Sequence, residues 1–418
     1  MYTKLERTRV LRDPLYGYIT VDYKIIADLI DTKEFQRLRR IRQLAGVGQV
    51  FQTAEHSRFT HSLGAYHMAS LVIQNVEGTE CMNEYDRMVF LVAALLHDVG
   101  HGPFSHAFEN VMSATHEDMT IKIILSPMTE INKVLSICPT LANDVASVIS
   151  HDGRFTLIES LVSSQLDVDR MDYLSRDAYM TGAAYGHIDY FRILRSMKIV
   201  DNKLLVRASG VHSIESYLMS RYHMYFQVYY HPTARSYECV LEAIYLRIKD
   251  LYLNKHSFNS NISSFLKVIE NPDDIMSYID LDDSYVNGFI KQMTKSKDKI
   301  LNKLCNAFLN RKLFKVIDLA DDIDPEEIIK IEESYPDELK KYYYKHVKST
   351  GVAYTHSKKT DINDIKVLLP NGKIKSLDQY SPIIKSLTSS SYKVIERIYY
   401  FEEKNEWYYC SWGITWWN

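Results

Sequence analysis

The chain has 418 residues, of which 46% are hydrophobic and 25% charged, and its formal net charge at pH 7 is -3. Such a chain can bury a large core, which excludes a disordered protein and predicts one large domain followed by a smaller one. The small negative charge argues against nucleic acid as the main partner. Residues 1–62 nevertheless carry eleven Lys and Arg against seven Asp and Glu, so this portion, at +4, favours an anionic ligand.

The five cysteines are scattered along the chain and never form a CxxC pair. This pattern fits a reducing compartment and excludes a zinc-finger or disulfide framework. No signal peptide precedes the first charged residues, and no apolar run reaches about 18 residues. We therefore expect a cytoplasmic protein without a membrane segment.

The first elements are a hairpin and a basic helix. Asp13-Pro14 and Gly17 punctuate the segment DPLYGYITV, which predicts a short β-hairpin. A helix is expected over 33–44, KEFQRLRRIRQL, because its apolar residues form one stripe. The arginines of this segment are either a solvated basic face or contacts for a phosphate or nucleotide.

Arg58 and His61 come next, three residues apart on an expected helix, so they share a face. A neutral imidazole can bind a metal ion while a guanidinium holds a phosphate oxygen nearby. The alternative is a structural salt bridge.

Residues 95–106, LLHDVGHGPFSH, are the most informative stretch of the chain. The apolar run before them, 88–96, is too short to cross a bilayer and predicts a buried helix. We expect this helix to continue through His97 and His101, which would then stand one turn apart with Asp98 beside them. The alternative is a polar helix end with hydrogen-bonded histidines.

Gly100, Gly102 and Pro103 should break that helix, so that His106 can re-enter the site from a new direction. Glu109 follows three residues later, and a carboxylate at this spacing can orient an imidazole and raise its pKa, as a general acid requires. An ordinary surface pair is the alternative.

Residues 165–177, QLDVDRMDYLSRD, predict a helix with a polar stripe. Asp169, Tyr173 and Asp177 recur every four residues, with Arg170 beside them. Such a stripe is a poor core face and a good wall for a site, although a solvated acidic helix is the alternative. The same four-residue spacing recurs on a later expected helix, at Arg221, Tyr225 and Tyr229. Core packing explains the two tyrosines better than it explains the arginine.

The end of the chain changes in character. Asp324-Pro325 predicts the start of a helix, and Asn371-Gly372 predicts the turn of a hairpin. A further helix is expected from Ser381-Pro382, and a strand over 392–401. We therefore divide the chain into a helical core, 1–318, and a smaller α+β lobe, 319–418.

Histidine and carboxylate ligands without thiolates suit one divalent ion such as Mn, Fe, Mg, Ni or Zn. Four candidate ligands come from three expected helices: His61, His97, Asp98 and Asp169. Such a site can lower the pKa of a bound water and orient it for attack on phosphorus. Three arginines would add permanent positive charge for a chain of phosphates: Arg58, Arg170 and Arg221.

The order of these ligands resembles the H...HD...D signature of the HD-domain metal-dependent phosphohydrolases. More narrowly, three segments resemble the deoxynucleoside triphosphate (dNTP) triphosphohydrolases that include the SAM-and-HD-domain enzyme: RQLAGVGQVFQTAEHSRFTHSLG, HDVGHGPFSHAFE and DVDRMDYLSRD. The likeness covers roughly residues 13–235. It implies a mainly α fold in which an HD-domain helical core carries the smaller C-terminal α+β lobe.

The resemblance also implies a role for each matching residue. His61, His97, Asp98 and Asp169 would bind the metal, and His106, supported by Glu109, would be the general acid. The phosphates of the substrate would be contacted by His101, His116, Arg58, Arg170 and Arg221. The sugar 3'-hydroxyl would be bound by Gln43 and Asp177, and Leu44 would lie beside the sugar or base. Tyr173 would close the space that a 2'-hydroxyl would need. Asp31, Gln36 and Arg39 match positions that read a guanine in the family's regulatory site.

The sequence departs from the family pattern in places. Arg170 stands where the family has a lysine, and Tyr225, which is expected in the substrate site, stands where it has a histidine. These two differences affect the expected phosphate geometry and base preference. Glu109 replaces an aspartate, which would move His106 by about one methylene. Near the regulatory site, Arg12 replaces an asparagine.

The leading hypothesis is the hydrolysis of dNTPs to deoxynucleosides and inorganic triphosphate by a homo-oligomer, a dimer or tetramer, with GTP or a dNTP as activator. One alternative is an HD phosphohydrolase that acts on another nucleotide phosphoester. Another is a non-catalytic regulator that binds nucleotides.

Overall fold

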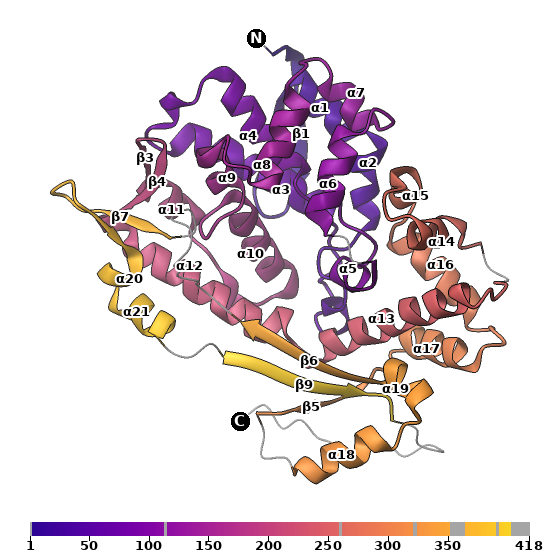
Figure 1. Cartoon of the computed structure of the whole chain (residues 1–418). Coiled ribbons are helices and arrows are strands. Elements are labelled where there is room, and N and C mark those ends of the chain that lie inside the picture. The colour runs from indigo at the N-terminus through magenta and orange to yellow at the C-terminus, as the bar shows by residue number, and fades with distance from the viewer. Residues whose placement is uncertain are drawn as a thin grey trace.

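The computed structural model describes residues 2–112, 115–258, 261–320, 324–351, 364–389 and 393–402, without the side chains of residues 106, 350, 351, 389 and 393. The described chain is mainly helical, with small sheets at its start and towards its end (Figure 1). The expected fold class is thereby confirmed. No helix in these ranges is both long and apolar enough to span a membrane.

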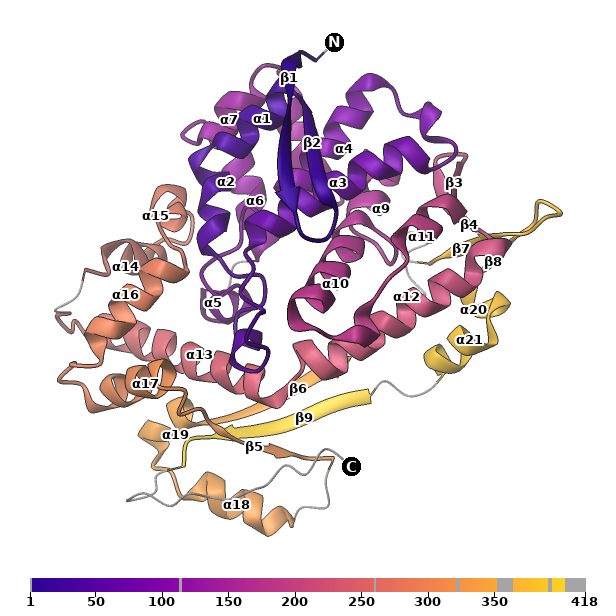
Figure 2. The same cartoon turned by 180° about the vertical axis from the view of Figure 1, so that it is seen from behind.

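The expected N-terminal hairpin is present. Strands β1 (Lys4–Asp13) and β2 (Gly17–Tyr23) pair antiparallel, with Asp13 opposite Gly17. Asp13 Oδ1 accepts hydrogen bonds from the backbone N–H groups of Leu15 and Tyr16, and Gly17 has a φ of 75°, which glycine adopts without strain. The hairpin lies in front of the helical core in Figure 2.

Three helices carry most of the residues that matter for function. They are α3 (Arg58–Asn75), α4 (Glu84–Leu96) and α10 (Val168–Thr181), and α3 packs against both of the others. The apolar run of 88–96 is buried within α4, as expected.

The remaining helices of this half surround these three and share one apolar core with them. They are α1 (Lys24–Asp31), α2 (Lys33–Arg37), α6 (His116–Leu125), α7 (Glu130–Leu135), α8 (Leu141–Ser150), α9 (Thr156–Val162), α11 (Tyr190–Ser196) and α12 (Val211–Met224). The apolar residues of α5 (His106–Met112) belong instead to a second core. A π-helical segment, Tyr225–Tyr229, continues α12.

A second apolar core gathers around the long helix α13 (Pro232–Leu253), which begins with proline at its first turn. The helices of this part are α14 (Ser263–Glu270), α15 (Ile275–Ile279), α16 (Asp283–Met293), α17 (Lys299–Leu309), α18 (Pro325–Glu333) and α19 (Asp337–Tyr343). Asp324 caps α18 through its side chain, as the sequence predicts.

Two small sheets complete the chain. One has the order β5-β9-β6, from β5 (Lys315–Asp318), β9 (Lys393–Tyr400) and β6 (Tyr344–Gly351). The other has the order β3-β4-β7-β8, from β3 (Met197–Val200), β4 (Lys203–Arg207), β7 (Lys366–Leu368) and β8 (Ile374–Ser376). Helices α20 (Leu377–Tyr380) and α21 (Pro382–Ser389) follow β8.

Three predicted C-terminal elements are therefore present: the hairpin β7–β8 at Asn371-Gly372, the helix from Pro382 and the last strand. The expected first residue of that strand, Tyr392, lies outside the described residues. Strand β7 pairs in parallel with β4, so the C-terminal part shares a sheet with the helical half. The division at 318/319 stays a prediction.

The expected helix over 33–44 is wrong beyond its first turn. Helix α2 ends at Arg37, a 3-10 turn follows, and Ile41 is extended. Tertiary hydrogen bonds explain the early end, because Arg42 forms a β-bridge with Ser57 and donates its backbone N–H to Asp283. These partners override the helical periodicity.

Candidate active site

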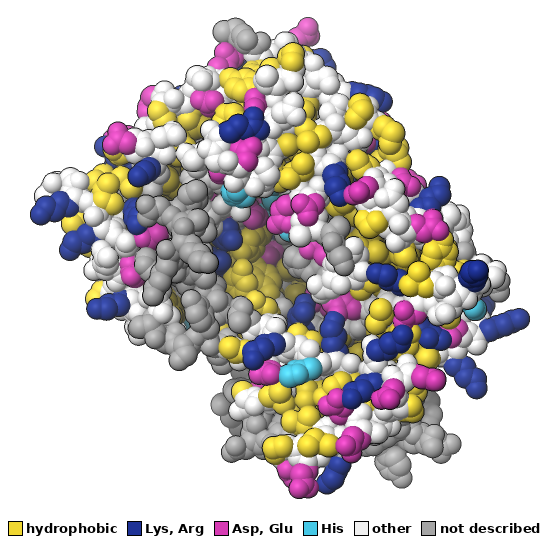
Figure 3. Space-filling view, in the orientation of Figure 1, with side chains coloured by type: hydrophobic (Ala, Val, Ile, Leu, Met, Phe, Trp, Pro, Cys, Tyr) yellow, Lys and Arg dark blue, Asp and Glu magenta, His cyan; other side chains and the backbone are white. Residues whose placement is uncertain are grey.

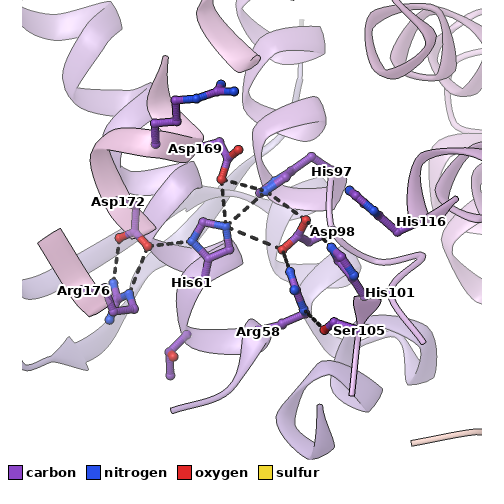
Figure 4. A network of polar contacts seen from close by, with 12 residues as sticks. Arg58, His61, His97, Asp98, His101, Ser105, His116, Asp169, Asp172 and Arg176 are labelled. Carbon is purple, nitrogen blue, oxygen red and sulfur yellow. Dashed lines mark hydrogen bonds and ion pairs between the residues drawn. The ribbon is translucent and has the colours of Figure 1, made fainter. Parts of the chain in front are cut away.

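Four side chains converge at the point where α3, α4 and α10 meet (Figure 4). His61 comes from α3, His97 and Asp98 directly follow the end of α4, and Asp169 lies in the first turn of α10. These are the four residues predicted to bind a metal ion. His61 and Asp98 are buried, whereas His97 and Asp169 are partly exposed.

The distances fit one small cation. The Nε2 atoms of His61 and His97 lie 3.2 Å apart, and Asp169 Oδ1 lies 3.2 Å from the first and 3.6 Å from the second. Asp98 places one oxygen 3.6 Å from His61 Nε2 and the other 3.4 Å from His97 Nε2. Ligand atoms that bind one ion at about 2.0–2.2 Å have this spacing. The donor set of imidazoles and carboxylates also fits a divalent ion.

The second nitrogen of each imidazole fixes the ring. His61 Nδ1 donates to Asp172 Oδ2 at 2.8 Å, and His97 Nδ1 donates to the carbonyl oxygen of Ala94 at 2.9 Å. Both Nε2 atoms are therefore left facing the centre of the cluster. Such outer partners set the tautomer and orientation of metal-binding histidines.

The electrostatics of the cluster favour a bound positive charge. Burial lowers the pKa of His61, but hydrogen bonds to Asp169 and Asp172 outweigh it and raise the pKa to about 10. Burial raises the pKa of Asp169, yet its bonds to His61 and His97 hold it well below the usual range. A divalent ion bound here would displace the protons that these groups otherwise share.

Asp172 and Arg176 support the cluster and were missed by the sequence analysis. Asp172 is fully buried, and besides His61 it accepts hydrogen bonds from Tyr16 Oη at 2.8 Å and from Arg176. Arg176 also pairs with Asp13 at 2.8 Å. The signal was available, because Asp172 and Arg176 are four residues apart on α10 and so share a face next to the expected polar stripe.

Gly64 makes room for Asp172. A Cβ atom at this position of α3 would lie 1.8 Å from Asp172 Oδ1 and 2.5 Å from Arg176 Nη2. The close approach of α3 and α10 therefore requires glycine here.

His101 and His116 form a second group around Asp98 and Glu109. The two rings stack, with centroids 3.8 Å apart and planes at 14°. His101 Nε2 lies 3.2 Å from Asp98 Oδ1, and Glu109 Oε1 lies 3.1 Å from His116 Nδ1 and 3.3 Å from His101 Nδ1. Ligand atoms of Asp98, His101 and His116 come within 4.8 Å of one another, so this group could also hold a cation.

The expectation that His101 continues the helix of His97 is wrong. Helix α4 ends at Leu96, and Gly100 passes so close to α6 that a Cβ atom would lie 2.2 Å from the backbone of His116. Burial, together with the nearby charges of Arg58 and His116, lowers the pKa of His101 to about 3, so its imidazole is neutral at neutral pH.

His106 begins α5, but its side chain lies outside the described part of the chain. The predicted pairing of His106 with Glu109 therefore stays a prediction. The carboxylate of Glu109 faces His101 and His116, as described above.

The arginines are held by acidic and amide partners. Arg58 is buried, and it pairs with Asp98 Oδ2 at 2.5 Å and donates from Nε to Ser105 Oγ at 2.9 Å. Arg170 pairs with Asp167. Arg221 donates to Gln165 Oε1 at 2.8 Å and lies over the ring of Tyr225.

A cavity of about 520 Å³ opens beside the four ligands. Figure 3 shows the hollow, with apolar side chains in its depth and Lys and Arg side chains along its lower rim. The predicted residues that line it are Gln43, Leu44, Arg58, His61, His97, Asp98, His101, His116, Asp169, Arg170, Tyr173, Asp177 and Tyr225. Arg221 is not among the lining residues and reaches the cavity through Tyr225.

Asp177 is fixed at the far wall of this cavity. His56 Nε2 lies 2.8 Å from Asp177 Oδ1, and Tyr229 Oη donates to Oδ2 at 2.8 Å. His56 is a further residue that the sequence analysis missed, and only the fold brings it to α10.

The three residues of the predicted regulatory site lie outside this cavity. Arg39 Nε donates to Gln36 Oε1 at 2.8 Å, and Gln36 Nε2 donates to the carbonyl oxygen of Ile30 at 2.7 Å. Asp31 pairs with Arg9 at 2.8 Å. They form a polar surface group around the start of α2.

Models of two protein families match consecutive parts of the chain. The model of the HD domain matches residues 58–177, and that of the HD associated region matches residues 188–406. An uncharacterized protein of Bacillus subtilis, YwfO, is 39% identical over 404 residues, which cover 95% of this chain and 93% of that protein. The deoxynucleoside triphosphate triphosphohydrolase SAMHD1 homolog of Dictyostelium discoideum is 29% identical over 76% of this chain and 61% of that protein.

Among solved structures, a phosphohydrolase from Bacteroides thetaiotaomicron superposes with a TM-score of 0.80 at 27% identity, covering 95% of this chain and 100% of that one. The sequence match, the shared fold and the His/Asp cluster agree. The chain thus belongs to the family of HD-domain metal-dependent phosphohydrolases that carry an HD-associated region.

Proposed function

We propose that the protein hydrolyses dNTPs to deoxynucleosides and inorganic triphosphate. The observation that supports this most is the single cavity lined by the four metal-ligand candidates, by cationic side chains and by Tyr173 and Asp177. A nucleotide with several phosphates offers matching groups: phosphate oxygens for the metal ion and the cationic side chains, and a sugar for Tyr173 and Asp177.

One divalent ion, held by His61, His97, Asp98 and Asp169, would supply a Lewis acid and a water of lowered pKa. The protein's own side chains would bind the phosphates of the substrate. Arg170 and His116 lie at the cavity and can bind phosphate oxygens, and the neutral His101 can donate a hydrogen bond. Water attack on the α-phosphorus breaks its bond to the 5'-oxygen.

The leaving 5'-oxygen needs a proton, and we assign this role to His106 with Glu109. The assignment is carried by the resemblance to the dNTP triphosphohydrolases. A general acid of this kind contributes about 10²–10⁴-fold to the rate.

The choice of sugar follows from the far end of the cavity. Asp177 is held by two partners and can accept a hydrogen bond from a 3'-hydroxyl, as can the amide of Gln43. Tyr173 lies between this end and the metal ligands, with its ring 6.3 Å from that of His61 and 6.2 Å from that of Tyr229. We assign to Tyr173 the exclusion of a 2'-hydroxyl.

We also assign an activator site for GTP or a dNTP to the surface group of Asp31, Gln36 and Arg39, in a homo-oligomer that is a dimer or tetramer. The support is the polar clustering of these residues and the excess of positive charge in residues 1–62.

Product analysis tests the proposal. Metal-loaded protein is incubated with each dNTP and each ribonucleotide, with and without GTP, across Mn, Mg, Fe and Co, and the nucleosides are separated by HPLC. We expect deoxynucleosides and triphosphate from dNTPs and little product from ribonucleotides. Release of pyrophosphate or orthophosphate, or turnover of another nucleotide phosphoester alone, would refute the proposal. Nucleotide binding without turnover would favour a regulator.

A further inference from the structure

Two neighbouring residues of the cavity wall have an unusual backbone. Phe104 and Ser105 have φ values of 56° and 53°, the left-handed region that side chains other than glycine rarely adopt. Both residues line the cavity. Consecutive strained residues persist only where the surroundings hold them in place.

The support comes from Asp283, at the start of α16 in the HD-associated region. Its Oδ1 accepts the backbone N–H of Phe104 at 2.8 Å, and its Oδ2 accepts the backbone N–H of Arg42 at 3.0 Å. The side chain is buried, and burial raises the pKa of Asp283 to about 6, so it is ionised at neutral pH. Both hydrogen bonds are then charge-assisted.

The two segments that Asp283 joins contact different residues of the site. Ser105 Oγ accepts from Arg58, which pairs with the metal-ligand candidate Asp98. On the other side, Arg42 precedes Gln43, whose backbone N–H donates to the carbonyl oxygen of His56 at 2.9 Å. One carboxylate thereby connects the phosphate end of the cavity with the sugar end.

Asp283 is not needed to cap its own helix. Asp282 is the N-cap of α16, accepting the backbone N–H of Tyr285 at 2.8 Å, and it also pairs with Arg40. We propose that Asp283 is a positioning residue, which holds the Phe104–Ser105 turn and the Arg42–Gln43 segment at the spacing that the substrate requires. The kinetic part of this proposal rests on the proposed dNTP hydrolysis.

The test uses Asp283→Ala and Asp283→Asn in the full-length, metal-loaded protein. For the alanine variant we expect kcat/KM for dNTPs to fall about 100-fold, since small displacements at a reacting site cost this much. The bound metal should remain at the wild-type level. Hydrogen–deuterium exchange at the amides of Arg42 and Phe104 should become about tenfold faster, because each loses a hydrogen bond to a charged group. The asparagine variant keeps one acceptor and should lie between.

Asp298→Ala is the matched control, because it removes a helix N-cap and an ion pair with Arg247, and neither residue lines the cavity. It should lower stability without changing kcat/KM or exchange at Arg42 and Phe104. If both Asp283 variants keep kcat/KM and amide exchange within about twofold of wild type, the inference is wrong. If wild type does not hydrolyse dNTPs, the proposed function fails, while exchange still decides the role of Asp283.

Discussion

His61 shows how a single side chain is prepared for metal binding. Its Nδ1 is fixed by Asp172 and its Nε2 faces His97 and Asp169, so the ring has one orientation and presents Nε2 to the position of the ion. His97 is oriented in the same way, because its Nδ1 donates to the carbonyl oxygen of Ala94 and its Nε2 faces His61. Because the supporting partners are all protein atoms, the ligands are arranged before the ion arrives.

Replacement of individual ligands should therefore remove the ion and the activity together. We expect His97→Ala and Asp169→Ala each to abolish turnover and to lower bound metal to background, measured by mass spectrometry of metal content and by nucleotide assay. His212→Ala is the control, since His212 is on the exposed surface of α12. Substantial residual turnover in either ligand variant would contradict the site assignment.

Elements whose signals are local could be predicted from the sequence. The turn at Asp13 to Gly17, the cap at Asp324 and the polar stripe of α10 each depend on residues close in the chain, and the structure has all three. Features that depend on residues far away in the chain could not be predicted from the sequence. Helix α2 ends early because Arg42 is bound by Ser57 and Asp283, which lies 241 residues away.

The site was predictable to a similar extent. The four ligand candidates lie in motifs and come together as expected, whereas Asp172 and His56 act through contacts with residues more than 100 positions away. The four-residue spacing of Asp172 and Arg176 predicts that they share a helix face, but no local pattern identifies His61 as the partner of Asp172, because this contact depends on how α3 and α10 pack.

The packing of α3 on α10 gives a prediction at this scale. Gly64→Ala places a Cβ atom against Asp172, so we expect a loss of about 1–3 kcal/mol in unfolding free energy and weaker metal binding as Asp172 moves from His61. Urea unfolding and metal titration would measure both. In Gly288→Ala, on α16, the added methyl group meets no atom within 4 Å, and this control should gain up to about 1 kcal/mol. Equal behaviour of the two variants would contradict the account.

Across the whole molecule, the two apolar cores meet at the cavity. The HD domain, 58–177, supplies the ligands, while Tyr225, Tyr229 and the carboxylate of Asp283 come from the HD-associated region. The ion would thus lie where the two matched regions come together, and its binding should stabilise the chain as a whole.

Metal removal should therefore change stability as well as activity. Treatment with a chelator should abolish turnover and lower Tm, and adding Mn back should restore both, because an ion at 100 times its Kd stabilises the folded state by about 2.7 kcal/mol. Differential scanning calorimetry of the wild type and of Asp169→Ala would show this. The Tm of the wild type should rise with Mn concentration while that of the variant should not, and an equal response to Mn in both proteins would speak against the site.

The central claim is that water attacks the α-phosphorus of a dNTP at this metal centre. Reaction of the metal-loaded protein with a dNTP in ¹⁸O-labelled water, followed by mass spectrometry of both products, measures it directly. The account predicts one labelled oxygen in inorganic triphosphate and none in the deoxynucleoside. Label in the deoxynucleoside, or in pyrophosphate or orthophosphate instead of triphosphate, would contradict it.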